Sequence, residues 1–188
     1  MKIVLGSQSP FRKHALDVLG LDYETVPSHF DEKSIRDDNP LELAKKLSEA
    51  KARSLSERHP DAIIVTGDLF VVYQNKVYEK PKSEGDAFDM LKLFSGSMLE
   101  IVTGLAVYNP TTDHMLSTVE KCEVTFRELI DTEINDYISR YPVLKCAGSF
   151  EADGLLRFAE TIQGKYTFRA GLPVNELVLF LREHGVNI

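Results

Sequence analysis

Polar and basic side chains cluster near the N-terminus, in the stretch "KIVLGSQSPFRKHALDVLG", which spans residues 2–20. Apolar residues 2–5 predict a short buried strand, and Ser9-Pro10 predicts the start of a helix, with Ser9 as N-cap. The free N–H groups of a helix start bind phosphate readily. The hydroxyl of Ser7 and the forked guanidinium of Arg12 would add donors for phosphate oxygens. The lysine-containing ending of a Walker A loop is absent. An ordinary capped helix with exposed cations explains the stretch as well, and taken alone the stretch favours that interpretation.

Asp68 is a second residue that could do chemistry, because it closes the apolar run "AIIVTGD". We expect a buried strand over 61–68 that ends in this carboxylate. In α/β sheets the carboxyl ends of strands line the ligand crevice. A carboxylate there can bind a metal ion or orient a water molecule. A plain turn aspartate is the alternative, and on this residue alone the two interpretations are balanced.

Lys51 is unusual because it shares the expected core-facing stripe of a helix with Ala44 and Leu47. A lysine there either extends its ammonium to solvent, which is the more frequent outcome, or reaches a buried anion. Lys80 and Glu32 lie in expected loops, where they would ordinarily be solvated charges.

The elements that must position these residues alternate between strands and helices. The patterns predict strands at 2–5, 22–26 and 61–68, a strand, turn and short strand over 69–81 with the turn at Gln74-Asn75, and a long hairpin at 99–129. Helices are predicted to begin at 10 and to end before Gly20, and over 40–58, about 84–94, 131–140 and 173–184. Residues 141–158 are expected to mix strand and loop. The fold class is therefore α/β, a mixed sheet with flanking helices, in two lobes.

Composition excludes several classes of protein. The chain has 188 residues, 43% of them hydrophobic, and a net charge of −7. The negative charge argues against a general nucleic-acid groove. No apolar run approaches the roughly 20 residues of a membrane span, and the start lacks a secretory pattern. The two cysteines show neither metal-ligand spacing nor a disulfide framework. We expect a cytoplasmic protein without nucleic-acid or membrane partners.

Several motifs occur together and in order, and their combination is far more specific than any one of them. The chain contains "LGSQSPFRK", "FDE", "SEAKARSL", "VTGD", "EKP", "LFSGSMLEIVTGLAV", "CAGSFEADG" and "AGLPVNEL". This series resembles the Maf family of nucleoside triphosphate pyrophosphatases from about Ile3 to Gly185. The resemblance implies one domain over 1–188, an elongated α/β fold with a cleft between two lobes, and metal-dependent hydrolysis of a nucleoside triphosphate to the monophosphate and pyrophosphate.

The resemblance also implies roles for individual residues. The family pattern places four residues around the triphosphate, namely Ser7, Arg12, Lys51 and Lys80. Glu32 and Asp68 match the acidic positions near a divalent cation, Mg²⁺ or Mn²⁺, and Asp68 matches the catalytic base. Cations around the phosphates would offset the charge that repels an attacking water.

Substrate choice is expected to depend on the base pocket. Phe11 after Ser-Pro, Cys146 in "CAGSF" and Asp153 resemble the 7-methyl-GTP pyrophosphatase subgroup. A 7-methylated guanine is cationic, so an aromatic ring and a carboxylate would both attract it. The chain departs from that subgroup, which usually has tryptophan at the position of Phe11 and glutamate at that of Asp153. It also has Leu69 where the subgroup has glutamine and Glu79 where a glycine is usual. These departures predict an altered base pocket, or an activity that is weaker or broader.

Two alternatives stay open beside 7-methyl-GTP hydrolysis. The enzyme could act on pyrimidine triphosphates, dTTP or UTP, although Phe11 and Asp153 argue against that substrate. A nucleotide-binding regulator of cell division with little turnover is the alternative of another class. The family also implies a homodimer.

Overall fold

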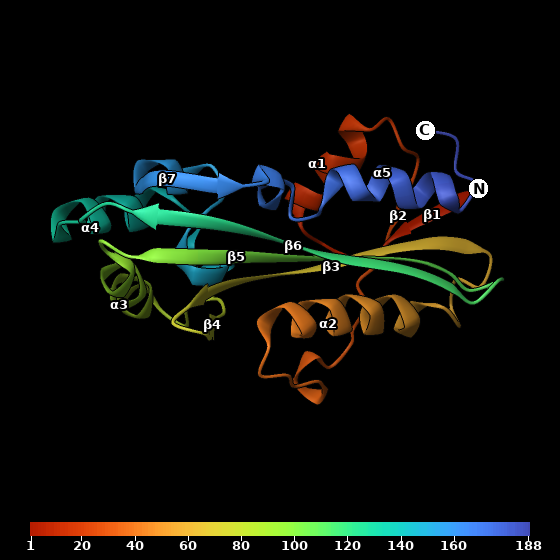
Figure 1. Ribbon diagram of the computed structural model, residues 1–188, viewed down its shortest axis with the longest axis horizontal. Helices are drawn as coiled ribbons and strands as arrows, with labels where there is room; N and C mark the ends of the chain where they lie inside the picture. The colour runs from red at the N-terminus through yellow and green to blue at the C-terminus, as the bar shows by residue number, and fades with distance from the viewer. The chain divides into compact units, whose positions relative to one another are not determined.

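The computed structural model describes residues 1–188 and confirms a mixed α/β fold (Figure 1). Its strands are β1 (Lys2–Leu5), β2 (Glu24–Thr25), β3 (Ala62–Tyr73), β4 (Lys76–Tyr78), β5 (Met98–Asn109), β6 (His114–Phe126) and β7 (Ala159–Gly164). Its α-helices are α1 (Pro10–Val18), α2 (Pro40–Leu55), α3 (Glu84–Phe94), α4 (Asp131–Arg140) and α5 (Val174–Glu183). The strands form one sheet in the order β2-β1-β3-β5-β6-β7, with β4 paired to β3. None of the helices combines the length and apolar character that a membrane span requires.

The chain divides into two compact units. Unit 1 contains residues 1–68, 103–120 and 167–188, and unit 2 contains residues 69–102 and 121–166. Strands β3, β5 and β6 each contribute residues to both units. The expectation of a single domain over 1–188 stays a prediction.

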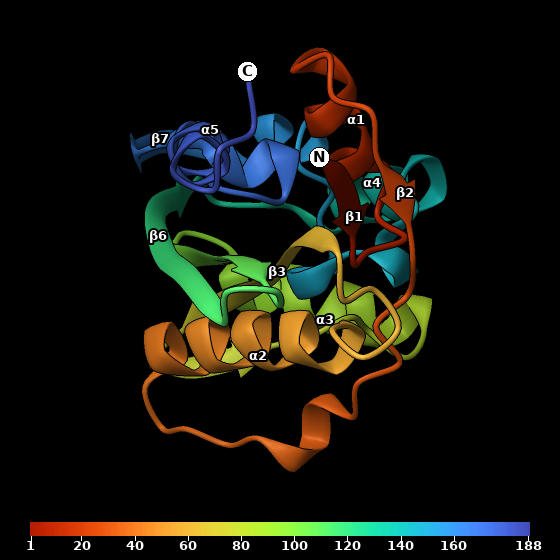
Figure 2. The ribbon, with the colours of Figure 1, turned by 90° about the vertical axis from the view of Figure 1, so that its right-hand side faces the viewer.

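In unit 1 the parallel strands β1, β2 and β3 lie between two helical layers. β1 pairs in parallel with β2 on one side and with β3 on the other, with Leu5 opposite Thr25 and Val65. Helices α1 and α5 cover one face of these strands, and α2 covers the other face (Figure 2). The connection from β1 to β2 runs through α1 on one face of the sheet, and the connection from β2 to β3 runs through α2 on the opposite face. Strand β1 lies between β2 and β3, so the strand order reverses at β1.

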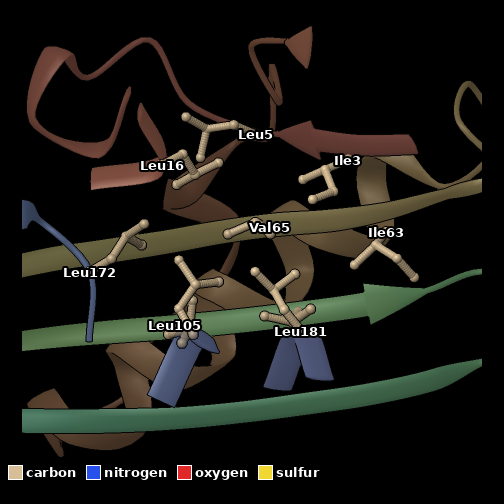
Figure 3. Packing of buried hydrophobic residues seen from close by; sticks show 10 residues of the cluster. Ile3, Leu5, Leu16, Ile63, Val65, Leu105, Leu172 and Leu181 are labelled. Carbon is tan, nitrogen blue, oxygen red and sulfur yellow. The ribbon is translucent and has the colours of Figure 1, made fainter. Parts of the chain in front are cut away.

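Alternating residues of β3 face the two helical layers, as a strand requires. Ile63 and Val65 pack in the cluster that includes Leu16 of α1 and Leu181 of α5 (Figure 3). The intervening residues face α2: Ile64, for example, packs in a second cluster with Ala52 and Leu55 of α2. Both clusters consist of nearly inaccessible side chains, so each face of the sheet has its own core.

Helix α2 lies unusually close to the sheet, because Gly104 of β5 has no side chain. A Cβ at Gly104 would lie 2.6 Å from both the Ala44 carbonyl oxygen and Ser48 Oγ. Thr66 Oγ1 of β3 donates a hydrogen bond to the Ser48 carbonyl at 2.6 Å. These two contacts fix where α2 lies along β3, and with it the position of Lys51, which follows Ser48 by almost one turn.

Unit 2 begins with the remainder of β3 and its hairpin partner β4. The predicted turn at Gln74-Asn75 is confirmed: both residues have positive φ, 49° and 62°, as a two-residue hairpin turn requires. The cap predicted for α3 is present, since Ser83 Oγ accepts the Asp86 N–H at 3.1 Å. The Asp86 carboxylate, however, accepts the Lys82 N–H rather than that of Ser83, so the reciprocal half of a capping box is shifted by one residue.

Several predicted boundaries are wrong. The strand expected to end at Asp68 continues to Tyr73, because residues 71–73 pair with β4. The strand expected over 22–26 is only Glu24–Thr25. Residues 141–158 contain no strand but three short 3₁₀ segments, at Val143–Lys145, Ala147–Ser149 and Gly154–Arg157. Strand β7, which no pattern predicted, is polar and mostly exposed, so it lacks the apolar alternation that marks a strand.

Candidate functional site

The junction between β1 and α1 arranges hydroxyl, amide and guanidinium donors within one turn. Ser7 Oγ accepts hydrogen bonds from the Ser9 N–H at 3.1 Å and from an Arg12 terminal nitrogen at 3.2 Å. Arg12 Nε donates to the Gly171 carbonyl at 2.9 Å. Ser9 is the N-cap of α1, but its side chain makes no capping bond. The guanidinium is therefore held by two segments that are distant in sequence.

Arg12 is close enough to two carboxylates to be affected by their charge. Loss of hydration on burial lowers the pKa of Arg12, while the negative charges of Asp68 and Glu32 raise it. Opposite charges nearby favour the ionised guanidinium, in contrast to burial. Arg12 thus lies in the same electrostatic site as the acidic pair.

Lys51 binds both predicted metal-binding carboxylates. Its Nζ lies 2.8 Å from Asp68 Oδ2 and 2.8 Å from Glu32 Oε1. Lys51 is 6% exposed and Asp68 is 8% exposed, whereas the Glu32 side chain is 56% exposed. Lys51 therefore does not extend to solvent but meets a buried anion, and Asp68 is a residue inside a strand rather than in a turn.

Local structure explains why these three residues meet. Asp68 follows Ile64 and Thr66 on the face of β3 that packs on α2. Lys51 lies on the buried stripe of α2, as its spacing from Ala44 and Leu47 predicted. Glu32 begins a 3₁₀ turn at Glu32–Ser34, where the Asp31 carboxylate caps the Lys33 N–H at 3.1 Å.

A pocket of about 290 Å³ lies at the carboxyl end of β1. Its lining residues are Gly6, Ser7, Gln8, Arg12, Pro27, Ser28, His29, Phe30, Glu32 and Lys51. All of them belong to unit 1. The strands here have the order β2-β1-β3 with helices on opposite faces. This is a topological switch point, the place where open α/β sheets bind ligands.

The acidic pair has the donor chemistry of a magnesium site. Both carboxylate oxygens lie 2.8 Å from one nitrogen, so they converge on a common point. Mg²⁺ takes oxygen ligands and is usually bound by one or two carboxylates together with substrate phosphates. No group of three or more His, Cys, Asp or Glu side chains is arranged for a metal ion. Glu32 and Asp68 therefore fit a cation that the substrate helps to bind.

The remaining predicted residues lie elsewhere. Phe11 is 37% exposed on α1 and does not line the pocket. Leu69, Lys80 and Asp153 belong to unit 2. Leu69 follows Asp68 in β3, so its side chain lies on the opposite face of the strand.

Lys80 and Asp153 are exposed side chains within unit 2. The charge of Lys80 affects Cys146, whose pKa burial raises to about 11 and Lys80 partly lowers. The Asp153 N–H donates to the Glu151 carboxylate at 3.0 Å. Sequence reasoning missed Glu151, which accepts the neighbouring Gly154 N–H as well.

Sequence reasoning also missed residues of unit 1 that form the pocket. Gly171 binds Arg12 through its carbonyl, and Gln8, His29 and Phe30 line the pocket. The sequence offered one signal for Gly171, because this residue lies in the motif "AGLPVNEL". The structure gives it a φ of 65°, a conformation that favours glycine. Residues 27–30 carried no pattern beyond a polar loop.

The chain is similar to several known proteins over nearly its whole length. A 7-methyl-GTP pyrophosphatase of Hydrogenovibrio crunogenus is 35% identical over 100% of this chain and 94% of its own length. A dTTP/UTP pyrophosphatase of Syntrophus aciditrophicus is also 35% identical, over 98% of this chain and 90% of its own length. The structure of a HAM1 protein from Coxiella burnetii has a similar fold, with a TM-score of 0.52, 11% identity, and coverage of 97% of this chain and 99% of its own. The family model for Maf-like proteins matches residues 2–184, and the chain belongs to the Maf family.

Proposed function

We propose that this Maf-family enzyme hydrolyses a nucleoside triphosphate, 7-methyl-GTP above all, to the monophosphate and pyrophosphate with a divalent cation. The observation that carries the proposal is the buried Lys51, bonded to Asp68 and Glu32 beside the pocket that Ser7 and Arg12 line. Both curated relatives are named as pyrophosphatases, which supports the reaction class. Nucleotide binding alone would not need the complete set of Ser7, Arg12, Glu32, Lys51, Asp68 and Lys80, which disfavours a regulator with little turnover.

Each residue helps to overcome the repulsion between an attacking water and the anionic phosphates. Arg12 and Lys51, with Lys80 proposed to join them, bind phosphate oxygens and offset their charge as it moves toward the leaving pyrophosphate. Asp68 orients the water and accepts its proton while the water oxygen bonds to phosphorus and the α–β anhydride bond breaks. A divalent cation on Glu32 and Asp68 would supply Lewis-acid stabilisation of the same oxygens.

The role of Asp68 is tested by Asp68→Asn. The amide keeps the shape but cannot accept a proton as the carboxylate does, and we expect pyrophosphate release to fall by about 10²–10⁴-fold. The matched control is Asp61→Asn, which changes an exposed aspartate just before the same strand and should leave turnover unchanged. Melting curves of both variants report whether folding is retained. An Asp68→Asn protein with near wild-type turnover would refute the assignment.

The choice of 7-methyl-GTP depends on the charge of the methylated base. Phe11 presents a partly exposed ring and Asp153 an exposed carboxylate, and both would attract a cationic purine more than neutral GTP. A desolvated cation–π contact is worth about 2 kcal/mol, roughly thirty-fold in kcat/KM. The dTTP/UTP relative, equally identical to this chain, makes pyrimidine triphosphates the second candidate.

The experiment compares kcat/KM for 7-methyl-GTP, GTP, UTP and TTP, with and without Mg²⁺ or Mn²⁺. The wild type should prefer 7-methyl-GTP, Asp153→Asn should reduce that preference through its lost charge, and Phe11→Ala should reduce it through lost stacking. Equal values for methylated and plain GTP would reject the 7-methylguanine assignment. A preference for UTP or TTP would replace it with the second candidate.

A further inference from the structure

The ammonium of Lys51 occupies the position where the two proposed metal ligands converge. Nζ lies 2.8 Å from one oxygen of each carboxylate. A magnesium ion binds carboxylate oxygens at about 2.0–2.1 Å, so an ion on either oxygen would lie within about 5 Å of Nζ. Two cations competing for the same oxygens at that separation repel each other, most strongly at the buried Asp68. The ammonium and the metal ion are therefore alternatives at these two oxygens.

The pocket gives Lys51 a second set of partners. Lys51 lines the pocket together with Ser7 and Arg12, whereas Asp68 does not line it. Phosphate oxygens bound by Ser7 and Arg12 would lie beside Nζ, and an ammonium binds phosphate as readily as carboxylate. Glu32 is more than half exposed and begins a short 3₁₀ turn, so it can adjust while the buried Asp68 stays in place.

We propose that Lys51 holds the place of the divalent cation in the nucleotide-free enzyme and leaves it only when a triphosphate offers oxygens to its ammonium. This inference rests on the proposed function, because it takes Glu32 and Asp68 as the metal ligands. Lys51 then couples the two ligands: the triphosphate draws Lys51 away, and the metal ion enters the vacated position. By linkage, each ligand raises the affinity of the other by the same factor.

The coupling has a direct consequence for the enzyme without nucleotide. Metal binding to the free enzyme is weak, since it must displace a buried ammonium from two charge-assisted bonds. Removing the ammonium leaves two convergent carboxylates without their cation, so metal affinity must rise. Lys51 acts as a positioning residue in this step, distinct from its contact with phosphate during the reaction.

The test measures Mn²⁺ binding without nucleotide, from the electron paramagnetic resonance signal of unbound Mn²⁺. We expect Lys51→Met and Lys51→Gln to bind Mn²⁺ at least about tenfold more tightly than the wild type, within the roughly 5- to 150-fold range typical of coupled sites. The glutamine variant keeps donors for the carboxylates without the charge and so guards against misfolding. The double variant Glu32→Gln/Lys51→Met should lose the gain.

The matched control is Lys46→Met on the same helix. Lys46 makes a single exposed ion pair with Asp37 at 2.6 Å, so its loss changes the net charge equally but frees no convergent pair. Mn²⁺ affinity should stay at the wild-type value. A gain in Lys46→Met as large as in Lys51→Met would mean that overall charge causes it, and the proposal would be wrong.

The wild type provides a test that needs no variant. Stoichiometric, tight Mn²⁺ binding by the nucleotide-free wild type would overturn the proposal, and so would unchanged affinity in the Lys51 variants. Failure of the proposed function would give another pattern of results. The enzyme would then release pyrophosphate from none of the nucleotides, while the Lys51 variants would still bind Mn²⁺ more tightly than the wild type. Metal-dependent hydrolysis without that gain would reject this inference alone.

Discussion

Adding one methyl group at Gly104 should displace the helix that carries Lys51. In Gly104→Ala the new Cβ would lie 2.6 Å from the Ala44 carbonyl oxygen and from Ser48 Oγ, about 0.8 Å short of the 3.4 Å at which ordinary contact begins. The Ala44 oxygen is helix backbone and cannot rotate away, so α2 itself must move. Such overpacking costs about 1–3 kcal/mol of unfolding free energy. At about 2–4 °C per kcal/mol for a chain of this size, the melting temperature should fall by roughly 2–12 °C.

Activity should fall together with stability. If α2 moves by the roughly 0.8 Å that the new Cβ needs, the 2.8 Å contact between Lys51 and Asp68 would lengthen beyond hydrogen-bond range. Because small misplacements at a reacting centre can reduce rates by about 10²-fold, kcat/KM for pyrophosphate release should drop well beyond what partial unfolding explains. The assay is steady-state kinetics at a temperature where the melting curve shows the variant fully folded.

Gly85→Ala is the matched control. A Cβ at Gly85 of α3 meets only Ser83 Oγ, at 3.8 Å, so it has room. Alanine in a helix is more favourable than glycine by about 0.5–1 kcal/mol, and the melting temperature should rise slightly with activity unchanged. If Gly104→Ala melts at or above the wild-type temperature, or melts no lower than Gly85→Ala, the close packing of α2 does not position the site.

Three further predictions concern the core, the pH dependence and the proposed phosphate contact. Leu16→Ala removes a fully buried side chain and should cost about 2–5 kcal/mol in urea unfolding, whereas Val18→Ala, at a 71% exposed position, should change stability by less than about 0.5 kcal/mol. Burial lowers the pKa of His184 below its ordinary 6.5, so below pH 6.5 the unfolded chain binds a proton that the folded protein does not. The free energy of unfolding should therefore fall as the pH drops below 6.5 and stay level above it. His184→Gln should remove this dependence on pH. Arg12→Lys keeps the charge but loses the fork that reaches two partners, and KM for the nucleotide should rise about tenfold or more while the melting curve moves little.

Sequence patterns predicted the elements whose boundaries are set locally. The start of α1 at Pro10, the turn at Gln74-Asn75 and the cap at Ser83 depend on neighbouring residues, and each is present. The end of β3 was misplaced because pairing with β4, not the local sequence, decides where that strand stops. Strand β7 was missed for a similar reason: its polar residues form a strand only by pairing with β6.

Sequence reasoning named five residues that the structure brings together, but not the contacts that join them: Ser7, Arg12, Glu32, Lys51 and Asp68. Periodicity placed Lys51 on the buried stripe of α2, yet could not identify the anion that it meets, because Asp68 and Glu32 come from other elements. The hydrogen bond from Arg12 to Gly171 joins residues 159 positions apart, a separation that local pattern cannot bridge. Phe11 precedes Arg12 in the chain, yet it does not line the pocket that Arg12 lines, because neighbouring residues of a helix point in different directions.

The construction of unit 1 from three separate segments has a consequence for synthesis. Ile3 near the start of the chain packs in the same cluster as Leu177 and Leu181 near its end, and the Arg12 guanidinium depends on the carbonyl of Gly171. A ribosome therefore synthesises Ile3 and Arg12 long before Gly171, Leu177 and Leu181. One of the two apolar clusters of residues 1–68 stays incomplete until residues 167–188 emerge, whereas all of unit 2 is already made by then. Unit 1 is therefore completed after unit 2, and a nascent chain stalled before Thr167 lacks the carbonyl that holds the Arg12 guanidinium.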